Sequence, residues 1–277
     1  MCPYSLSLHV GSLSINLYGV MLALGFLAAL LSWRLLGRRE GRDLAFCSDL
    51  LFWIMVSGVL GARAAYVAAN FGAFRDNRWS MLYLHEGGLV FYGGFLGSLA
   101  AVLVFARWRR ERILPLLDFI VTALPLGHAF GRIGCFLRGC CFGRIWDGAL
   151  AVRFPAWSDP WCVQVNHGRI LRTAPLSQPV HPVQLYEAAF NVVLYLALVW
   201  AYRRRTRDGL IASAYLLTYP VARFWVEEFR GDERLRWLGV DVAQWVSLGL
   251  FLFGVVLLIR SWRQPPRAQG ALPAATT

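Results

Sequence analysis

The stretch His128-Ala-Phe-Gly-Arg132-Ile-Gly-Cys135-Phe-Leu-Arg138-Gly-Cys-Cys-Phe-Gly143 closes a long apolar segment that begins near Leu116. This pattern is typical of a membrane helix that opens into a loop. Arg132 lies inside the apolar run, and an arginine at the middle of a membrane helix costs about 2.5–3.5 kcal/mol on insertion scales. A chain tolerates such a charge where it faces a partner, a cavity or a ligand. Glycines in the stretch also leave the backbone bare for close approach of a helix or a substrate. They are Gly127, Gly131, Gly134, Gly139 and Gly143.

The composition around this stretch places the whole chain in a membrane. Of 277 residues, 57% are hydrophobic and only 16% are charged, which predicts an all-α polytopic membrane protein. The net charge of +12 comes from 28 basic residues, all arginine and mostly clustered between apolar spans. That is the positive-inside pattern of membrane proteins, so we expect no nucleic-acid partner. The first arginine is Arg34, and the first span therefore resembles a retained helix more than a cleaved signal peptide.

Seven apolar segments are long enough to cross a bilayer, at about 20 residues each. They lie near Ser14–Leu36, Cys47–Asn70, Gly88–Ala106, Leu116–Phe136, Pro182–Tyr202, Leu210–Phe229 and Val240–Trp262. Fifteen arginines flank these spans on one side, and five lie in the short loops of the other. This asymmetry predicts an outside N-terminus and a cytoplasmic C-terminus.

The segments outside these predicted helices are a long connector and a C-terminal tail. The segment 137–181, between the fourth and fifth spans, is too long for a plain connector and is predicted to form a periplasmic cap, with a short strand at Leu150–Phe154. Residues 1–262 are predicted to form a single membrane domain, and the Pro/Ala-rich tail 263–277 is predicted to be disordered.

Unusual polar residues converge on the outer half of the predicted bilayer, although they come from six different helices. They are Tyr18, Arg63, Tyr92, Arg132, His181, Gln184, Glu187, Arg223 and Glu227. Arg223 and Glu227 are spaced i,i+4, so they form either a structural ion pair or part of a binding site. Three buried arginines outnumber two carboxylates, and arginine forks favour an anionic ligand such as phosphate. The His181-Pro182 step also predicts a helix N-terminus with Pro182 at its first position, which attracts anions.

The third span opens with Gly87-Gly88-Leu-Val-Phe-Tyr92-Gly93-Gly94-Phe-Leu-Gly97. Gly93 and Gly97 form a G-x-x-x-G pair, which is typical of tight helix packing. Such packing is compatible with a Tyr92 side chain that faces a cavity.

The cysteines Cys135, Cys140 and Cys141 lack the paired C-x-x-C spacing and the nearby histidine of a zinc site. We therefore expect packing residues beside Arg132, with no metal ligand or nucleophile among them. Cys162 in the outer segment is a candidate disulfide partner for one of them. A membrane thiol-redox enzyme is the alternative that this cluster leaves open.

Several motifs together resemble the prolipoprotein diacylglyceryl transferase family. They are Tyr18-Gly19, Gly61-Ala62-Arg63, Gly87-Gly88 with Gly93-Gly94, Gly131-Arg132-Ile-Gly134, His181-Pro-Val-Gln184-Leu-Tyr186-Glu187 and Arg223-Phe-Trp-Val-Glu227-Glu-Phe-Arg230. The resemblance implies a seven-helix enzyme of the bacterial cytoplasmic membrane, without a cofactor or a metal. Such an enzyme transfers the diacylglyceryl group of phosphatidylglycerol to the lipobox cysteine of a prolipoprotein and releases glycerol 1-phosphate.

The resemblance implies that Tyr18, Arg132, Arg223 and Glu227 belong to the site. The polar and glycine residues discussed above add further candidates. The catalytic candidates are Tyr92, His128, Arg132, His181, Arg223 and Glu227, and the substrate-binding candidates are Tyr18, Arg63, Gly93, Gly94, Gly131, Gly134, Gln184, Glu187 and Arg230. Two departures from the family signature concern the proton acceptor. Cys135 replaces an asparagine and Cys140 an acid, while Tyr92 stands where a histidine often occurs. Tyr92, His128 and His181 therefore all stay open as acceptors of the substrate's thiol proton.

Two other classes of protein compete with this reading. A transporter of anionic phospholipid or phosphorylated solutes would share an arginine-lined cavity, but such proteins commonly show internal repeats, and none is evident here. A purely structural scaffold would leave the clustered intramembrane charges without a role.

Overall fold

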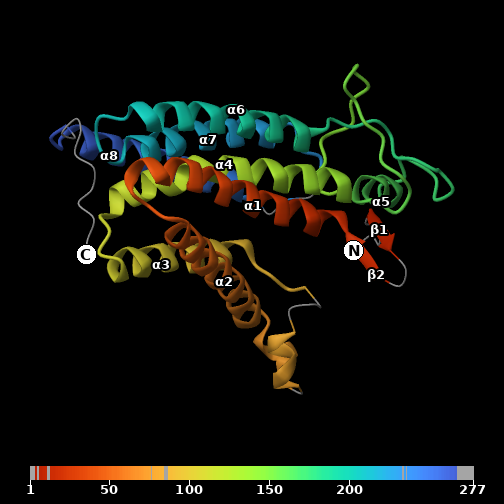
Figure 1. Cartoon of the computed structure of the whole chain (residues 1–277). Helices are drawn as coiled ribbons and strands as arrows, with labels where there is room; N and C mark the ends of the chain where they lie inside the picture. Colours follow the sequence, from red (N-terminus) through yellow and green to blue (C-terminus); the bar gives the residue numbers. More distant parts are fainter. Residues whose placement is uncertain are drawn as a thin grey trace. The chain divides into compact units, whose positions relative to one another are not determined.

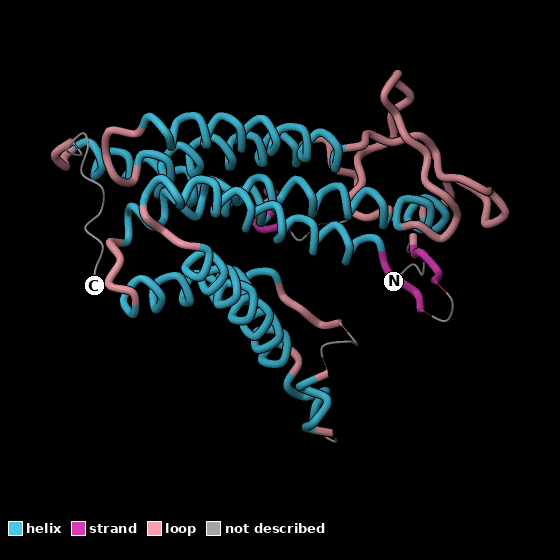
Figure 2. Tube along the Cα trace, viewed as in Figure 1, coloured by secondary structure: helices cyan, strands magenta, loops and turns pink. Residues whose placement is uncertain are grey.

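The computed structural model describes residues 4, 6–10, 13–75, 77–83, 87–232, 234 and 236–266. Within these residues the chain is predominantly helical, as Figure 2 shows. The long helices are α1 (Leu17–Gly37), α2 (Leu44–Ala69), α3 (Phe91–Trp108), α4 (Ile113–Arg138), α6 (Val183–Arg204), α7 (Leu210–Glu228) and α8 (Val242–Trp262), and α5 (Asp159–Asn166) is short. The predicted all-α class is confirmed. Beyond residue 266, the predicted disordered tail lies outside the described residues.

Short elements connect these helices. The strands β1 (Ser7–Val10) and β2 (Leu13–Asn16) pair antiparallel before α1, and β3 (Arg236–Trp237) and β4 (Val240–Asp241) pair antiparallel before α8. In the described part of the chain, short 3₁₀ helices occur at Arg38–Glu40, Phe71–Phe74 and Arg78–Leu82.

Within the described residues, six helices are long and apolar enough to cross a membrane, namely α1, α2, α3, α4, α6 and α8. The chain is therefore a multi-pass membrane protein. The remaining long helix, α7, has 19 residues but carries Arg223, Glu227 and Glu228 near its end. These charges lower its hydropathy, so α7 is not among the six.

The chain divides into two compact units. The unit formed by residues 33–116 is built on α2 and α3. A methyl group added to Gly61 would lie 2.4 Å from the carbonyl oxygen of Gly93, and one added to Gly97 would lie 2.2 Å from that of Ser57. The glycines thus let the two helix backbones touch, which confirms the tight helix packing predicted from the G-x-x-x-G pair.

The other unit combines residues 1–32 with residues 117–271 and contains α6, α7 and α8 as well as most of α1 and α4. In Figure 1, α1, α4, α6 and α7 run side by side along much of their length. Gly25 brings α1 close to α4, since a methyl group there would lie 3.1 Å from Cβ of Phe130. Gly254 of α8 packs in the same way against Leu216 of α7.

A buried carboxylate fixes the start of α7. Asp118 of α4 is fully buried and accepts hydrogen bonds from the backbone N–H groups of Gly209, Ile211 and Ala212, at 2.7, 3.0 and 2.8 Å. The first N–H groups of a helix have no partner within it. Asp118 supplies that partner from another helix and so holds α4 and α7 together.

The segment between α4 and α6 contains α5 and a small apolar core of Phe142, Phe154 and Val180. The strand predicted at Leu150–Phe154 is wrong: Val152 forms only an isolated bridge with Val180. Pro155 and Pro179 flank this bridge on the two paired segments, and proline has no N–H to extend a ladder.

Candidate functional site

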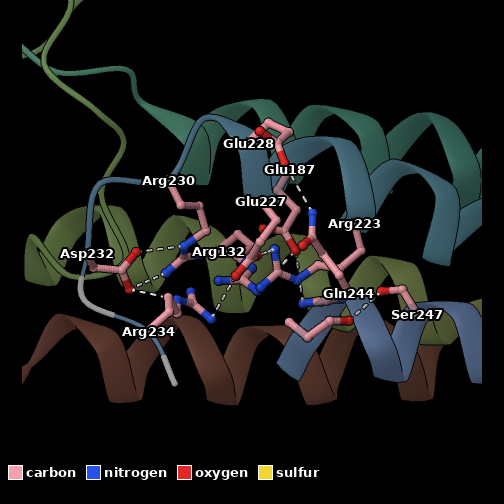
Figure 3. Close-up of polar contacts among 12 residues, drawn as sticks. Arg132, Glu187, Arg223, Glu227, Glu228, Arg230, Asp232, Arg234, Gln244 and Ser247 are labelled. Carbon is pink, nitrogen blue, oxygen red and sulfur yellow. Dashed lines mark hydrogen bonds and ion pairs between the residues drawn. The ribbon is translucent and has the colours of Figure 1, made fainter. Parts of the chain in front are cut away.

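An intramembrane ion pair joins two helices at the centre of the site. Arg132 projects from α4 toward Glu187 in the first turns of α6, with 3.0 Å between Nη2 and Oε1. The Glu187 side chain is 2% exposed and that of Arg132 14% exposed. The pair lies in a cluster of charged side chains from several helices (Figure 3). The structure therefore brings Arg132 and Glu187 together, as their predicted depth in the bilayer suggested.

A second ion pair lies at the end of α7. Arg223 and Glu227 are one helical turn apart and in direct contact, and the Glu227 side chain is 1% exposed. Glu227 also meets Arg234, with 3.4 Å between Oε1 and Nη1. One buried carboxylate thus holds two guanidinium groups, one from α7 and one from the segment that follows it.

A third group of charges closes the cluster. Arg230 makes a two-pronged contact with Asp232, in which Nε and Nη2 donate to the two carboxylate oxygens at 2.8 Å each. Asp232 also accepts from Nε of Arg234 at 3.2 Å. Figure 3 shows Arg230, Asp232 and Arg234 beside the Arg223–Glu227 pair. Arg234 joins the second and third groups into one network, and the Arg132–Glu187 pair lies beside it (Figure 3). We call the residues of all three groups the arginine cluster: Arg132, Arg223, Arg230 and Arg234 with Glu187, Glu227 and Asp232.

The arginine cluster carries an excess of positive charge, because four arginines meet three carboxylates. Not every donor is used within it. Nε of Arg132 is buried and has no hydrogen-bond acceptor in the described part of the chain. A buried donor without an acceptor is costly and is suited to binding an acceptor from a ligand. Excess charge together with an open donor suits an anion.

His128 lies at the edge of the arginine cluster. His128 lies on α4, one helical turn before Arg132, and its Nε2 is 3.8 Å from Oε1 of Glu187. Its ring packs against Tyr219 of α7, with 5.2 Å between the centroids. Tyr219 in turn lies close to Arg132. His128 is thus held between a carboxylate and an aromatic ring next to the arginine.

His181 has different surroundings, although the sequence grouped it with His128. Its ring stacks on Trp146 with 4.2 Å between centroids, and Nδ1 lies 3.4 Å from the Tyr186 hydroxyl. Burial, and then the positive charge of Arg144, lower the pKa of His181 below its usual value. No ion pair links the described surroundings of His181 to the arginine cluster.

The anion-binding helix start predicted at Pro182 is displaced. Pro182 is the N-cap residue and α6 begins at Val183, so Pro182 does not occupy the first helical position. The N–H of Val183 is already bonded to the carbonyl of His181, at 2.9 Å. Gln184 is buried and donates from Nε2 to the carbonyl of Cys140 at 2.7 Å, which ties the loop after α4 to α6.

The loop after α4 is hydrogen-bonded both to the start of α6 and to the end of α7. Gly143 donates its N–H to the carbonyl of His181 (3.1 Å), and Arg144 donates to that of Phe229 (2.8 Å). A methyl group added to Gly143 would lie 2.5 Å from both Cβ and the carbonyl oxygen of His181. Glycine is required here because two backbones pass at contact distance.

Tyr18, Gly131 and Gly134 lie at the contact of α1 with α4. A methyl group on Gly134 would lie 3.0 Å from Cδ2 of Tyr18, and one on Gly131 would lie 3.9 Å from Leu22. Gly134 therefore permits close approach of Tyr18, whereas a side chain at Gly131 would be in ordinary van der Waals contact with Leu22.

The three cysteines meet beside this contact. The sulfur atoms of Cys135, Cys140 and Cys141 lie within 4.8 Å of one another, and all three thiols are free. Hydrogen bonds with Cys135 and Cys140, and the charge of Arg230, lower the pKa of the Cys141 thiol although burial opposes this. Cys162 is disulfide-bonded, so the prediction that it pairs with one of these three is wrong.

The remaining predicted site residues belong to the unit 33–116. Arg63 is buried and donates to four backbone carbonyls, those of Ser80, Met81, Gly87 and Gly88, at 2.7 to 3.3 Å. These bonds favour a role in supporting the fold. Tyr92 is 48% exposed on the first turn of α3. Gly93 and Gly94 face α2 and serve the helix packing described above.

Sequence reasoning missed three residues of the site: Tyr219, Asp232 and Arg234. The residues after α7 had been assigned to a short outer loop, and no motif marked their side chains. The alternation of acids and arginines in Arg230-Gly-Asp232-Glu-Arg234 was the available signal, since such charges pair when they fold back on a helix end.

Comparison of the sequence with known proteins shows the family of this chain. The family model for prolipoprotein diacylglyceryl transferase matches residues 5–260. A phosphatidylglycerol–prolipoprotein diacylglyceryl transferase of Idiomarina loihiensis is 36% identical, over 79% of this chain and 77% of its own length. Proteins of the same name from Stenotrophomonas maltophilia and Burkholderia orbicola are 34% and 32% identical, over 98% and 97% of this chain and 95% and 97% of their own lengths. The chain therefore belongs to the prolipoprotein diacylglyceryl transferase family.

Proposed function

We propose that this chain transfers the diacylglyceryl group of phosphatidylglycerol to the lipobox cysteine of prolipoproteins and releases glycerol 1-phosphate. The relatives' name contains both substrates, phosphatidylglycerol and prolipoprotein. The observation that carries the proposal is the arginine cluster, with its net positive charge among membrane helices. Phosphatidylglycerol is the substrate whose phosphate suits that charge.

The reaction requires that negative charge on the leaving phosphate be stabilised, and the arginine cluster can do this. The sulfur of the substrate cysteine forms a bond to the terminal carbon of the diacylglyceryl group, and the bond from that carbon to the phosphate oxygen breaks. The electron pair of the broken bond stays on the phosphate, which gains negative charge as it leaves. Guanidinium groups stabilise that charge most where water is excluded. Arg132 and Arg223 are the proposed phosphate ligands, and Glu187 and Glu227 hold their forks in place.

The proton of the substrate thiol needs an acceptor. His128 is the proposed one, because its Nε2 lies 3.8 Å from Glu187 beside Arg132, whereas His181 is stacked on Trp146. A thiol needs only modest help near neutral pH, since its ordinary pKa is about 8.5 and nearby cations favour the thiolate. The nucleophile comes from the substrate, and no cofactor enters this scheme.

The other candidates receive supporting roles. Tyr18, Gly131 and Gly134 line the α1–α4 contact and are proposed to admit the lipid. Tyr92 is proposed to hydrogen-bond the lipid head group. Gln184, Arg230, Arg63, Gly93 and Gly94 are proposed to act through the loops and helix contacts that they hold.

We further propose seven membrane spans, with α7 as the additional one, in the bacterial cytoplasmic membrane. The N-terminus would lie outside and the C-terminus in the cytoplasm, with residues 137–181 as a periplasmic cap. The arginine distribution supports this orientation. The contacts of α7 with α4, α6 and α8 support its place among the spans, because neighbouring helices can shield its charges from lipid.

The test uses purified protein, phosphatidylglycerol and a peptide that carries a lipobox. Mass spectrometry should find one added diacylglyceryl unit on the peptide cysteine, and phosphate analysis should find glycerol 1-phosphate in equal amount. A peptide with serine in place of that cysteine is the control and should gain no mass. Movement of phosphatidylglycerol between leaflets without peptide modification would instead indicate a lipid transporter.

A further inference from the structure

Three cysteine side chains that the proposed reaction does not use converge at the end of α4. The sulfur atoms of Cys135, Cys140 and Cys141 lie within 4.8 Å of one another, all three thiols are free, and none is fully buried. Their spacing in the sequence had indicated packing residues. The backbone explains why the sulfur atoms meet nevertheless.

The end of α4 is a Schellman motif. Gly139 has φ +73°, its N–H donates to the carbonyl of Phe136, and the N–H of Cys140 donates to that of Cys135, at 3.0 Å each. In this motif the residue after the left-handed glycine folds back over the residue five positions earlier. Cys140 is therefore placed directly against Cys135.

Cys141 joins the other two through an unfavourable backbone conformation. Its φ is +60°, which side chains other than glycine, asparagine and aspartate rarely adopt. Neighbouring side chains in an extended segment point to opposite sides, so Cys140 and Cys141 would normally diverge. The left-handed turn at Cys141 brings both thiols to one point, and such local strain often occurs at functional sites.

The cysteines lie near a positive charge and border a cavity. The positive charge of Arg230 lies close to the Cys141 side chain. Cys140 and Cys141 line a cavity of about 310 Å³ together with Asp159, Asn166 and Asp232. A ligand can therefore reach the thiols, and a carboxylate or a water molecule is available on the cavity side.

We propose that Cys135, Cys140 and Cys141 form a three-thiolate site for a thiophilic d¹⁰ metal ion, the class to which Zn²⁺ and Cu⁺ belong. Thiolate ligands select such soft ions. Three sulfur atoms bound to zinc at about 2.3 Å lie roughly 3.8 Å apart, so small side-chain rotations close the site. Asp159 or a water from the cavity completes the coordination. This site is separate from the proposed transfer chemistry and does not depend on it.

Metal binding to the intact protein in detergent tests the proposal. The protein is reduced, freed of metal and titrated with Zn²⁺ or, without oxygen, with Cu⁺. Elemental analysis after gel filtration should find about one ion per chain. Bound ion should also protect the three thiols from alkylation, as read by peptide mass spectrometry, and this measurement requires no variant.

Variants locate the ion. Cys135→Ser, Cys140→Ser and Cys141→Ser should each weaken binding at least about tenfold. Cys47→Ser is the matched control, since Cys47 is a free, buried cysteine on α2, and it should bind like the wild type. Co²⁺ in place of Zn²⁺ should give sulfur-to-cobalt charge-transfer absorption that the three variants lose.

Three results would overturn the proposal. The first is substoichiometric binding of both ions by fully reduced wild-type protein. The second is unchanged binding in the triple Cys→Ser protein. The third is alkylation of Cys135, Cys140 and Cys141 at the same rate with and without ion. A disulfide between two of the three, found in the protein as isolated and persisting under reduction, would count against it in the same way.

Discussion

Arg132 of α4 and Glu187 of α6 form a buried ion pair, with 3.0 Å between Nη2 and Oε1, while Nε of the same arginine has no acceptor in the described residues. Glu187 thus fixes one edge of the guanidinium and leaves another edge available. Arg223 and Glu227 form a second buried ion pair, on α7. Carboxylates that hold arginine forks before substrate arrives reduce the reorganisation needed when charge develops on the leaving phosphate.

Replacement of either arginine by lysine tests the fork geometry. We expect Arg132→Lys and Arg223→Lys to lower kcat/KM by roughly 10²-fold, because a lysine is a point charge and does not donate two parallel hydrogen bonds. Peptide lipidation is the assay. Arg144→Lys is the control, because the Arg144 side chain is 59% exposed in its pair with Glu228, and this variant should keep its rate. Near-normal turnover of both cluster variants would rule out bidentate phosphate binding.

Glu187→Gln should impair both stability and activity. Removing one partner of a buried ion pair costs about 3–5 kcal/mol, because it leaves an uncompensated charge. Thermal unfolding in detergent and peptide lipidation should both show the loss. Glu228→Gln is the matched substitution at an exposed carboxylate, 57% exposed, and should change stability by less than about 1 kcal/mol. Equal effects of the two substitutions would contradict the assigned role of Glu187.

His128, His181 and Tyr92 are distinguished by activity at different pH values. If His128 takes the thiol proton, His128→Ala should lose roughly 10²-fold in rate across about pH 5 to 9. His181→Ala and Tyr92→Phe should retain most of their activity, because His181 stacks on Trp146 and the role proposed for Tyr92 is a hydrogen bond to the lipid head group, not proton transfer. Loss of activity in Tyr92→Phe alone, with both histidine variants active, would make Tyr92 the base.

Asp118→Asn should loosen the start of α7 without touching the proposed chemistry. An asparagine side chain has one carbonyl oxygen in place of two carboxylate oxygens, and Asp118 uses both oxygens for three backbone N–H groups. We expect a loss of about 1–3 kcal/mol in the free energy of unfolding. Asp49→Asn is the comparison, since Asp49 forms a partly exposed pair with Arg109. A melting temperature that falls no further for Asp118→Asn than for Asp49→Asn would refute this role.

The orientation of the helices is tested by reporter fusions. Fusions after Trp33, Arg107, Arg204 and Trp262 should all report the cytoplasm, since the arginine-rich loops follow these positions. A fusion after Asp232 should report the periplasm if α7 crosses the membrane. A cytoplasmic result there would leave α7 as a helix that does not span.

The sequence by itself determined the helices and the membrane class. Runs of apolar residues of bilayer length are a local property, so the bounds of the predicted apolar segments agree with those of the helices α1–α4 and α6–α8 to within a few residues. The pair Arg223–Glu227 was predictable for the same reason, because i,i+4 residues share a helix face. The G-x-x-x-G packing of Gly93 and Gly97 likewise depends on spacing along a single helix.

Only the tertiary structure decided which side chains meet across elements. Arg132 is paired with Glu187, Arg230 with Asp232, and Asp118 with the start of α7, because chain segments far apart in sequence pack together. The strand expected at Leu150–Phe154 does not form, since a strand requires a partner segment with a continuous ladder of backbone hydrogen bonds, and Val152 forms an isolated bridge instead. The convergence of Cys135, Cys140 and Cys141 depends on left-handed backbone at Gly139 and Cys141. Backbone dihedrals at a helix end turn side chains through large angles, and spacing along the sequence does not encode that rotation.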